Sequence, residues 1–178
     1  SWKGRFFRPG RRGDDAMAVR DIREYPEQVL MEKAKDVTDF GEELQSLLRD
    51  MWETMAVNDG VGLAAPQIGV SLRVAVIGWR DRRIVLVNPV VIEQEGEEEL
   101  EEGCLSAPGF FEKVTRPARV VVEARDEHGE PIRLEEEGFL ARVLMHEIDH
   151  LEGKLFLDRL SPLKRRYLKK KLQKRVEK

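Results

Sequence analysis

The sequence is poor in the features that mark secreted and membrane proteins. Its 178 residues include a single cysteine, Cys104, which cannot form an internal disulfide, so a reducing compartment is expected. No stretch is apolar for long enough to span a membrane, and the N-terminal residues lack the apolar core of a signal peptide. We therefore expect a cytoplasmic protein with no membrane partner.

Charge of one sign is not in large excess either. The formal net charge of −3 gives no general reason to expect nucleic-acid or membrane binding. Acidic residues gather at 93–102 and basic residues at 164–178, and we expect both runs to be solvated surface. Beyond a basic C-terminal helix the sequence carries no direct nucleic-acid signal, and we expect a monomer.

The length and composition fit one domain with a core of its own. Hydrophobic residues make up 41% of the chain, as in globular proteins. Residues 1–16 are rich in Arg and Gly and have no apolar periodicity, whereas Met17 opens a more ordinary sequence. We expect residues 1–16 to be a flexible leader or a remnant of cloning, and residues 17–178 to form a single domain.

Periodicity predicts both helices and strands. Apolar residues recur at helical spacing over 40–57, where Asp39 and Glu42 predict a capping box. Residues 139–151 are apolar nearly all round, which predicts a buried helix, and Ser161-Pro162 predicts the start of a third helix. Strands are expected at 72–77, 83–87, 119–126 and 132–134, with a hairpin turn at 128–129. The elements do not alternate strictly, so we expect an α+β fold, with mixed or antiparallel sheets packed around a central buried helix and a C-terminal helix.

The strongest local motif is HEIDH at 146–150. In a helix His146 and His150 share one face, so their imidazoles can bind one metal ion together. Glu147 lies beside them, where it can act as a general base toward water. The alternative is a pair of histidines satisfied by hydrogen bonds alone, but on an otherwise apolar helix these polar side chains would be costly without partners.

Two histidines leave a catalytic metal site short of one protein ligand. Cys104 lies in EGCLS at 102–106, between a glycine and polar neighbours. Taken alone, it is best read as a small buried hydrophobe, which is common for a free cysteine. The need for a third ligand reverses that preference.

A third segment, GVGLAAPQ at 60–67, ends in an amide side chain. Its glycines permit close backbone approach, and its small residues suit a tight substrate cleft. Taken alone, it would be an ordinary turn between a helix and a strand.

These three segments together resemble the peptide deformylases, whose motifs GxGLAAxQ, EGCLS and HExxH occur in this order. The resemblance runs from about Val19 to the C-terminal helix and makes 17–178 a single catalytic domain. Many members have Gln directly before HExxH, where this sequence has Met145. That difference puts one local contact in doubt.

The resemblance implies a metal site and its chemistry. Cys104, His146 and His150 would bind one metal ion per chain. The family resemblance implies Fe²⁺, with Zn²⁺, Ni²⁺ or Co²⁺ as possible substitutes. Glu147 would take a proton from water and give it to the leaving amine. The Gln67 side chain and the Leu105 backbone N–H would stabilise the oxyanion.

The resemblance also implies the substrate, the N-formylmethionyl end of nascent polypeptides, with the ribosome as a place to meet them. The peptide backbone would lie along Gly60, Val61, Gly62 and Gly103, like an added strand. The methionine side chain would enter an apolar pocket lined by Val61, Leu105, Val143 and the histidine-bearing helix.

Charged residues flank the expected ligands. Glu102 and Asp149 each lie within two positions of one, and carboxylates commonly orient metal ligands. Because an unpaired buried charge is expensive, we predict that Arg116 forms a buried pair with Glu102 or Asp149.

Two other classes of function remain open. An HExxH zinc endopeptidase would usually take a third His or Glu ligand, which Cys104 argues against. A non-catalytic metal-binding protein would normally use four protein ligands, and the only other histidine, His128, lies in an expected polar turn.

Overall fold

A computed structural model describes residues 18–177, and the predicted leader at 1–16 lies outside them. The helices are α1 (Glu42–Val57), α2 (Gly138–Leu151) and α3 (Pro162–Val176), with short 3-10 helices η1 (Gln28–Met31), η2 (Ala65–Ile68) and η3 (Phe156–Arg159). The strands are β1 (Gly62–Ala64), β2 (Val74–Trp79), β3 (Arg82–Glu95), β4 (Glu98–Cys104), β5 (Ala107–Arg116), β6 (Arg119–Arg125) and β7 (Pro131–Glu137). No helix in this part of the chain is long and apolar enough to cross a membrane.

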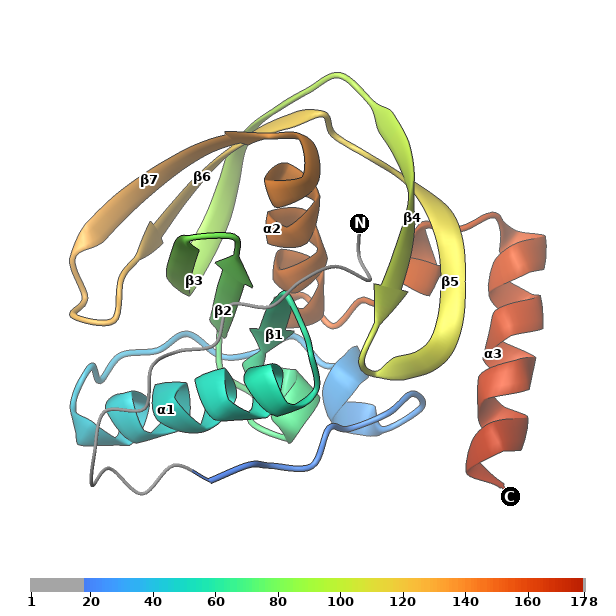
Figure 1. Ribbon diagram of the computed structural model, residues 1–178, viewed down its shortest axis with the longest axis horizontal. Coiled ribbons are helices and arrows are strands. Elements are labelled where there is room, and N and C mark those ends of the chain that lie inside the picture. Colours follow the sequence, from blue (N-terminus) through green and yellow to red (C-terminus); the bar gives the residue numbers. More distant parts are fainter. Residues whose placement is uncertain (1–17, 178) are drawn as a thin grey trace.

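The strands form two separate antiparallel sheets. Five strands pair in the order β1-β2-β3-β6-β7, and β4 pairs only with β5. In Figure 1, α2 lies between the large sheet and the β4–β5 ribbon, and α3 lies at the far edge, beside β5. The expected α+β class with antiparallel sheets and a C-terminal helix is therefore confirmed.

The core has three parts, each of which includes residues of one helix. Helix α2 packs on β1, β2, β6 and β7, and every residue from Leu140 to Leu151 is buried. Helix α1 packs its apolar stripe on β1, β2 and η2. Helix α3 is mostly exposed and docks through Leu168 and Leu172, which lie one turn apart, against η3 and β5.

Of the two predicted helix N-caps, one is confirmed and one is wrong. Ser161 caps α3, accepting a hydrogen bond from the Lys164 N–H at 3.3 Å. The capping box at Asp39 is wrong, because α1 begins at Glu42 after Gly41, and the Asp39 carboxylate accepts from the Gly41 N–H instead. The polar hairpin turn at 128–129 is confirmed between β6 and β7.

Candidate metal centre and active site

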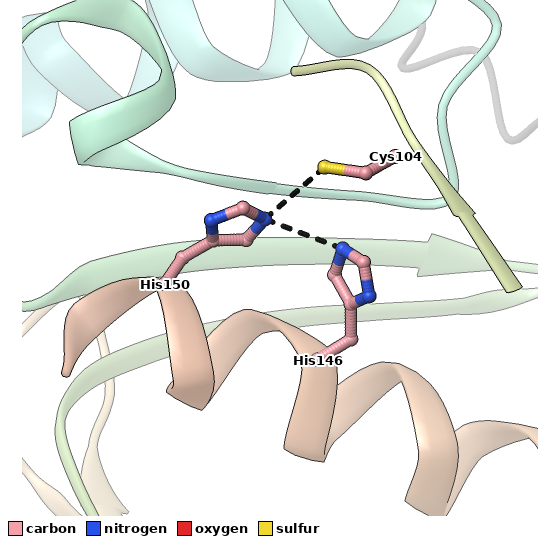
Figure 2. A group of neighbouring side chains, drawn as sticks. All are labelled: Cys104, His146 and His150. Atoms are coloured by element: carbon pink, nitrogen blue, oxygen red, sulfur yellow. Dashed lines mark hydrogen bonds between the residues drawn. The ribbon is translucent and has the colours of Figure 1, made fainter. Parts of the chain in front are cut away.

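Cys104, His146 and His150 meet at one point, although the cysteine is far from the histidines in sequence. The histidines lie one turn apart on α2, and Cys104 ends β4 just before the tight turn into β5. Cys104 Sγ lies 3.3 Å from His150 Nε2, which lies 3.3 Å from His146 Nε2 (Figure 2). The three possible ligand atoms all lie within 4.8 Å of one another.

The surroundings suit a metal ion at this point. His146 Nδ1 lies 2.9 Å from Glu102 Oε1, so the ring donates to the carboxylate through Nδ1 and turns its Nε2 lone pair toward Cys104. One sulfur and two imidazole nitrogens then face one another, and such a group of electron donors needs a cation or a proton between them. A thiolate with two imidazoles is a donor set that zinc and iron accept. His150 Nδ1 is buried and finds no partner among the described residues.

Electrostatics separate the two histidines. Burial lowers the pKa of His146, but its hydrogen bonds to Cys104 and Glu102 outweigh burial and raise the pKa to about 10. Burial, and next the charge of His146, hold the pKa of His150 well below its usual range. The surroundings of His146 therefore favour positive charge, which a metal ion can supply as well as a proton.

The pKa values of the two glutamates at the centre, Glu102 and Glu147, are shifted in opposite directions. Burial raises the pKa of Glu102, but the hydrogen bond and charge of His146, with those of Arg116, outweigh it and lower the pKa to about 2. Burial raises the pKa of Glu147 to about 7, and the charge of His146 offsets this only in part. Glu102 is thus a fixed anion, whereas Glu147 can bind and release a proton near neutral pH.

Arg116 joins the acids that flank the ligands. Its Nε and Nη2 bind the Glu102 carboxylate at 2.9–3.2 Å, and its Nη1 binds Asp149 Oδ2 at 2.7 Å. The sequence left the choice between these acids open, and Arg116 binds both. Arg159 also binds Asp149, at 2.7 and 3.0 Å, and Arg142 lies 3.3 Å from Glu102. Neither Arg142 nor Arg159 was predicted from the sequence to belong to the site.

Gln67 is held in place through both ends of its amide. Its Oε1 accepts from the Ala64 N–H at 3.0 Å, and its Nε2 donates to Ser106 Oγ at 3.2 Å. Nε2 also lies 3.5 Å from Cys104 Sγ. The amide nitrogen therefore points at the metal centre. Ser106, which belongs to EGCLS but was not proposed as a site residue, helps to orient it.

A narrow cavity of about 180 Å³ opens onto this group. Ten residues line it: Asp59, Gly60, Val61, Gly62, Gln67, Cys104, Leu105, Gly109, Phe111 and His146. Most of the proposed substrate-binding residues are thus brought together, but Gly103 and Val143 do not line the cavity. Val143 is fully buried in the core around α2, and Gly103 lies beneath the Phe111 ring. Phe111 was not expected from the sequence.

Glu147 lies against the Gly-rich loop. A Cβ added at Gly62 would meet Glu147 Oε2 at 2.7 Å and Cδ at 2.9 Å. Glycine is therefore required at this position if the carboxylate is to keep its place against Gly62, which itself lines the cavity, whereas Glu147 does not.

Backbone hydrogen bonds connect residues 23–25 to both GVGLAAPQ and EGCLS. The Arg23 N–H donates to the Gln67 carbonyl at 2.7 Å, and the Tyr25 N–H donates to the Ser106 carbonyl at 2.9 Å. Met145, by contrast, lines a separate groove of about 570 Å³ with Ile148 and Asp149. The position at which this sequence departs from many peptide deformylases therefore faces away from the cavity.

An α+β fold with a Cys-His-His group and a buried glutamate next to it has the features of a metallohydrolase. The sequence model of the family described as "Polypeptide deformylase" matches residues 19–166. The chain belongs to this family.

Relatives and solved structures of that name cover nearly the whole chain. A peptide deformylase of Thermodesulfovibrio yellowstonii is 46% identical over 162 residues, 88% of this chain and 98% of its own length. A crystal structure of a peptide deformylase from Legionella pneumophila is 50% identical, with a TM-score of 0.84 over 90% of this chain and 96% of that one. The crystal structure of the peptide deformylase from Thermus thermophilus is 46% identical, with a TM-score of 0.82 over 88% of this chain and 99% of that one.

Proposed function

We propose that this protein hydrolyses the formyl group from the N-terminal methionine of newly made polypeptides and releases formate. The observation that carries the proposal is the convergence of Cys104 Sγ with Nε2 of His146 and His150, next to a cavity that Cys104, His146 and Gln67 line. Membership of the polypeptide deformylase family supports the same reaction.

The three converging atoms would hold one ion per chain. We propose Fe²⁺ as the working metal, as the family resemblance implies. Zn²⁺, Ni²⁺ and Co²⁺ would be substitutes, because thiolate and imidazole donors bind all four. Such an ion supplies a Lewis acid and lowers the pKa of water toward about 7. Glu102 would keep His146 in the tautomer whose Nε2 lone pair is available to that ion.

The protein's own groups would then move the proton and stabilise charge. Glu147, beside Gly62, would take the proton from water as the oxygen attacks the formyl carbon, and would give it to the amine nitrogen as the carbon–nitrogen bond breaks. The Gln67 Nε2 amide and the Leu105 backbone N–H would donate to the oxygen that becomes negative. Only donors that are already oriented help without further reorganisation, and Gln67 is oriented from both ends.

The cavity's size and lining would select the substrate. A formyl carbon carries a hydrogen where an acetyl carbon carries a methyl group, so close walls around the reacting carbon would accept formyl and exclude acetyl. The peptide backbone would lie along Gly60, Val61 and Gly62 like an added strand. Its methionine side chain would enter beside Val61 and Leu105, toward α2 and the core residue Val143.

We further propose that residues 17–178 form one catalytic domain with α2 as its central helix, acting as a cytoplasmic monomer. Nascent peptides emerge at the ribosome, and we place the reaction there. Residues 1–16 should be dispensable for activity, which a chain starting at Met17 would test by its rate and melting temperature.

One comparison tests the reaction. The protein is loaded anaerobically with Fe²⁺ and offered matched formyl-Met and acetyl-Met peptides, with formate as the readout. Formate release from the first peptide and no cleavage of the second are expected. Cleavage of internal bonds in unmodified casein would instead support an endopeptidase.

The Glu147→Ala variant separates base from ligand. We expect it to lose turnover and to retain its metal after purification, because Glu147 is not among the converging ligand atoms. Loss of the metal together with the side chain would contradict the role of general base.

The choice of metal is tested in air. Iron(II) can be oxidised next to the Cys104 thiolate, whereas zinc has no redox chemistry. We expect the iron-loaded protein to lose activity in air with oxidation of Cys104 detectable by peptide mass, and the zinc-loaded protein to be slower and more durable. An iron form that stays fully active in air would exclude this weakness.

A further inference from the structure

The metal centre is divided between two parts of the fold that no backbone ladder joins. Cys104 ends β4, in the two-stranded β4–β5 sheet, whereas His146 and His150 lie on α2. Among the described strands, neither β4 nor β5 pairs with the five-stranded sheet. The distance between the thiolate and the imidazoles therefore depends on side chains that bridge α2 and this small sheet.

Arg142 makes the broadest of these bridges. It lies on α2 one turn before His146, and so on the same helix face. Its Nη2 donates to the Glu98 carbonyl of β4 at 2.6 Å, and its Nη1 donates to the Val114 carbonyl of β5 at 2.8 Å. Nη1 also lies 3.3 Å from Glu102 Oε2. One guanidinium thus binds both strands of the sheet and the acid that orients His146.

Because Arg142 is buried, its donors need hydrogen-bond partners within the protein. Arg142 is 2% exposed, and a buried guanidinium is tolerated only where its donors are satisfied. The planar fork fixes the direction of both carbonyl bonds, which a flexible ammonium cannot do. An uncharged side chain at 142 would also leave the two carbonyls without their partner.

We infer that Arg142 is a positioning residue that holds the β4–β5 sheet against α2, so that Cys104 Sγ stays within ligand distance of the histidine nitrogens. The inference rests on the proposed metal centre, but it concerns the approach of the thiolate and not the hydrolysis of the formyl group. Arg142 touches neither the cavity nor the converging atoms.

Arg73 provides a matched control. It is also a buried arginine, 7% exposed, and donates to two backbone carbonyls, those of Leu151 and Pro89, at 3.2 and 3.1 Å. Those bonds tie the end of α2 to β3 and make no contact with β4 or β5. Arg73→Met therefore removes a comparable buried guanidinium that does not connect α2 to the β4–β5 sheet.

The experiment compares Arg142→Met, Arg142→Lys and Arg73→Met with the unaltered chain. Zinc affinity is measured by competition with a chelator, and thiolate coordination by the sulfur-to-cobalt charge-transfer band of the Co²⁺-loaded proteins. We expect Arg142→Met to lose about 10- to 100-fold in zinc affinity, the usual range for residues that support metal ligands, and to weaken the cobalt–thiolate band. Arg142→Lys should recover part of both, and Arg73→Met should keep the band even if its melting temperature falls.

Equal loss of the band in Arg142→Met and Arg73→Met would overturn the inference, since the effect would then be one of general stability. An unchanged band and affinity in both Arg142 variants would also overturn it. If Arg142→Met does not fold, the Arg142→Lys and Arg73→Met comparison decides alone. A band missing from the unaltered chain would instead contradict the metal centre itself.

Discussion

Nδ1 of His146 lies 2.9 Å from Oε1 of Glu102, and Arg116 grips the same carboxylate through two of its nitrogens. The imidazole is thus oriented by an acid that is itself held in place. Because the pKa of Glu102 is lowered to about 2, this carboxyl group remains an anion at neutral pH.

Glu102→Gln should weaken metal binding without removing a ligand. The amide keeps the shape of the side chain but loses the charge that makes His146 a strong donor. We expect zinc affinity to fall about 10- to 100-fold, measured against a competing chelator. The neighbouring Glu101→Gln is the control, because Glu101 is exposed on the same strand. Equal affinity of the two variants would show that orientation by Glu102 contributes nothing.

Arg116→Met should destabilise the fold. Removing one partner of a buried ion pair typically costs about 3–5 kcal/mol. Glu102 keeps Arg142 and Asp149 keeps Arg159, so we expect a loss near the lower end, about 3 kcal/mol, in denaturant unfolding. Arg119→Met, which removes surface ion pairs on β6, should cost at most about 1 kcal/mol. Similar losses in both variants would contradict a special role for the buried cluster.

Gly62→Ala should impair catalysis more than folding. The added Cβ would lie 2.7 Å from Glu147 Oε2, so the carboxylate must move. A misplacement of about 1 Å can cost about a hundredfold in rate, and we expect kcat to fall by about 10- to 100-fold with the metal content unchanged. In the control, Gly41→Ala, the new Cβ meets only the movable carboxylate of Asp39. Normal kcat in Gly62→Ala would mean that Glu147 can act from elsewhere.

Gln67→Ala should lower kcat by about a hundredfold or more, the scale for losing one oxyanion donor. KM should change less, because the hydrogen bond strengthens as charge develops on the oxygen. Gln45→Ala on α1, which loses amide bonds to two backbone carbonyls away from the cavity, is the matched control. Steady-state kinetics in which only KM changes would reduce Gln67 to a residue that binds substrate.

The sequence predicted the parts of the fold whose signal is local. Helices α1 and α2 follow apolar periodicity, and HEIDH brings two histidines together through helix geometry alone. Strands β4 and β5 were not predicted from the sequence. The β4 segment, EELEEGC, has almost no apolar residue to alternate with its polar ones. The conformation of β4 depends on its pairing with β5, and strand pairing is not visible in a single segment.

The candidate site divides in the same way. Flanking acids made Arg116 a candidate, since charge beside a ligand demands compensation. Arg142 and Ser106 carry no such signal, because each gains its partner only through contacts between distant segments. Arg159 lies ten residues after Asp149, beyond the end of α2, and the chain must fold back for the two to meet. Phe111 lies in a segment for which the sequence predicted no element, and only the fold places its ring over Gly103.

The buried charges around Glu102 also constrain how this protein can change over evolutionary time. Arg116 serves two acids, Glu102 serves two arginines and a histidine, and Asp149 serves two arginines. A single exchange at any of these three residues removes at least two buried contacts at once, so we expect an accepted replacement to be accompanied by compensating changes. An exposed pair such as Arg49 with Glu42 can drift one residue at a time. The cluster should therefore behave in a lineage as one inherited unit, lost or kept together.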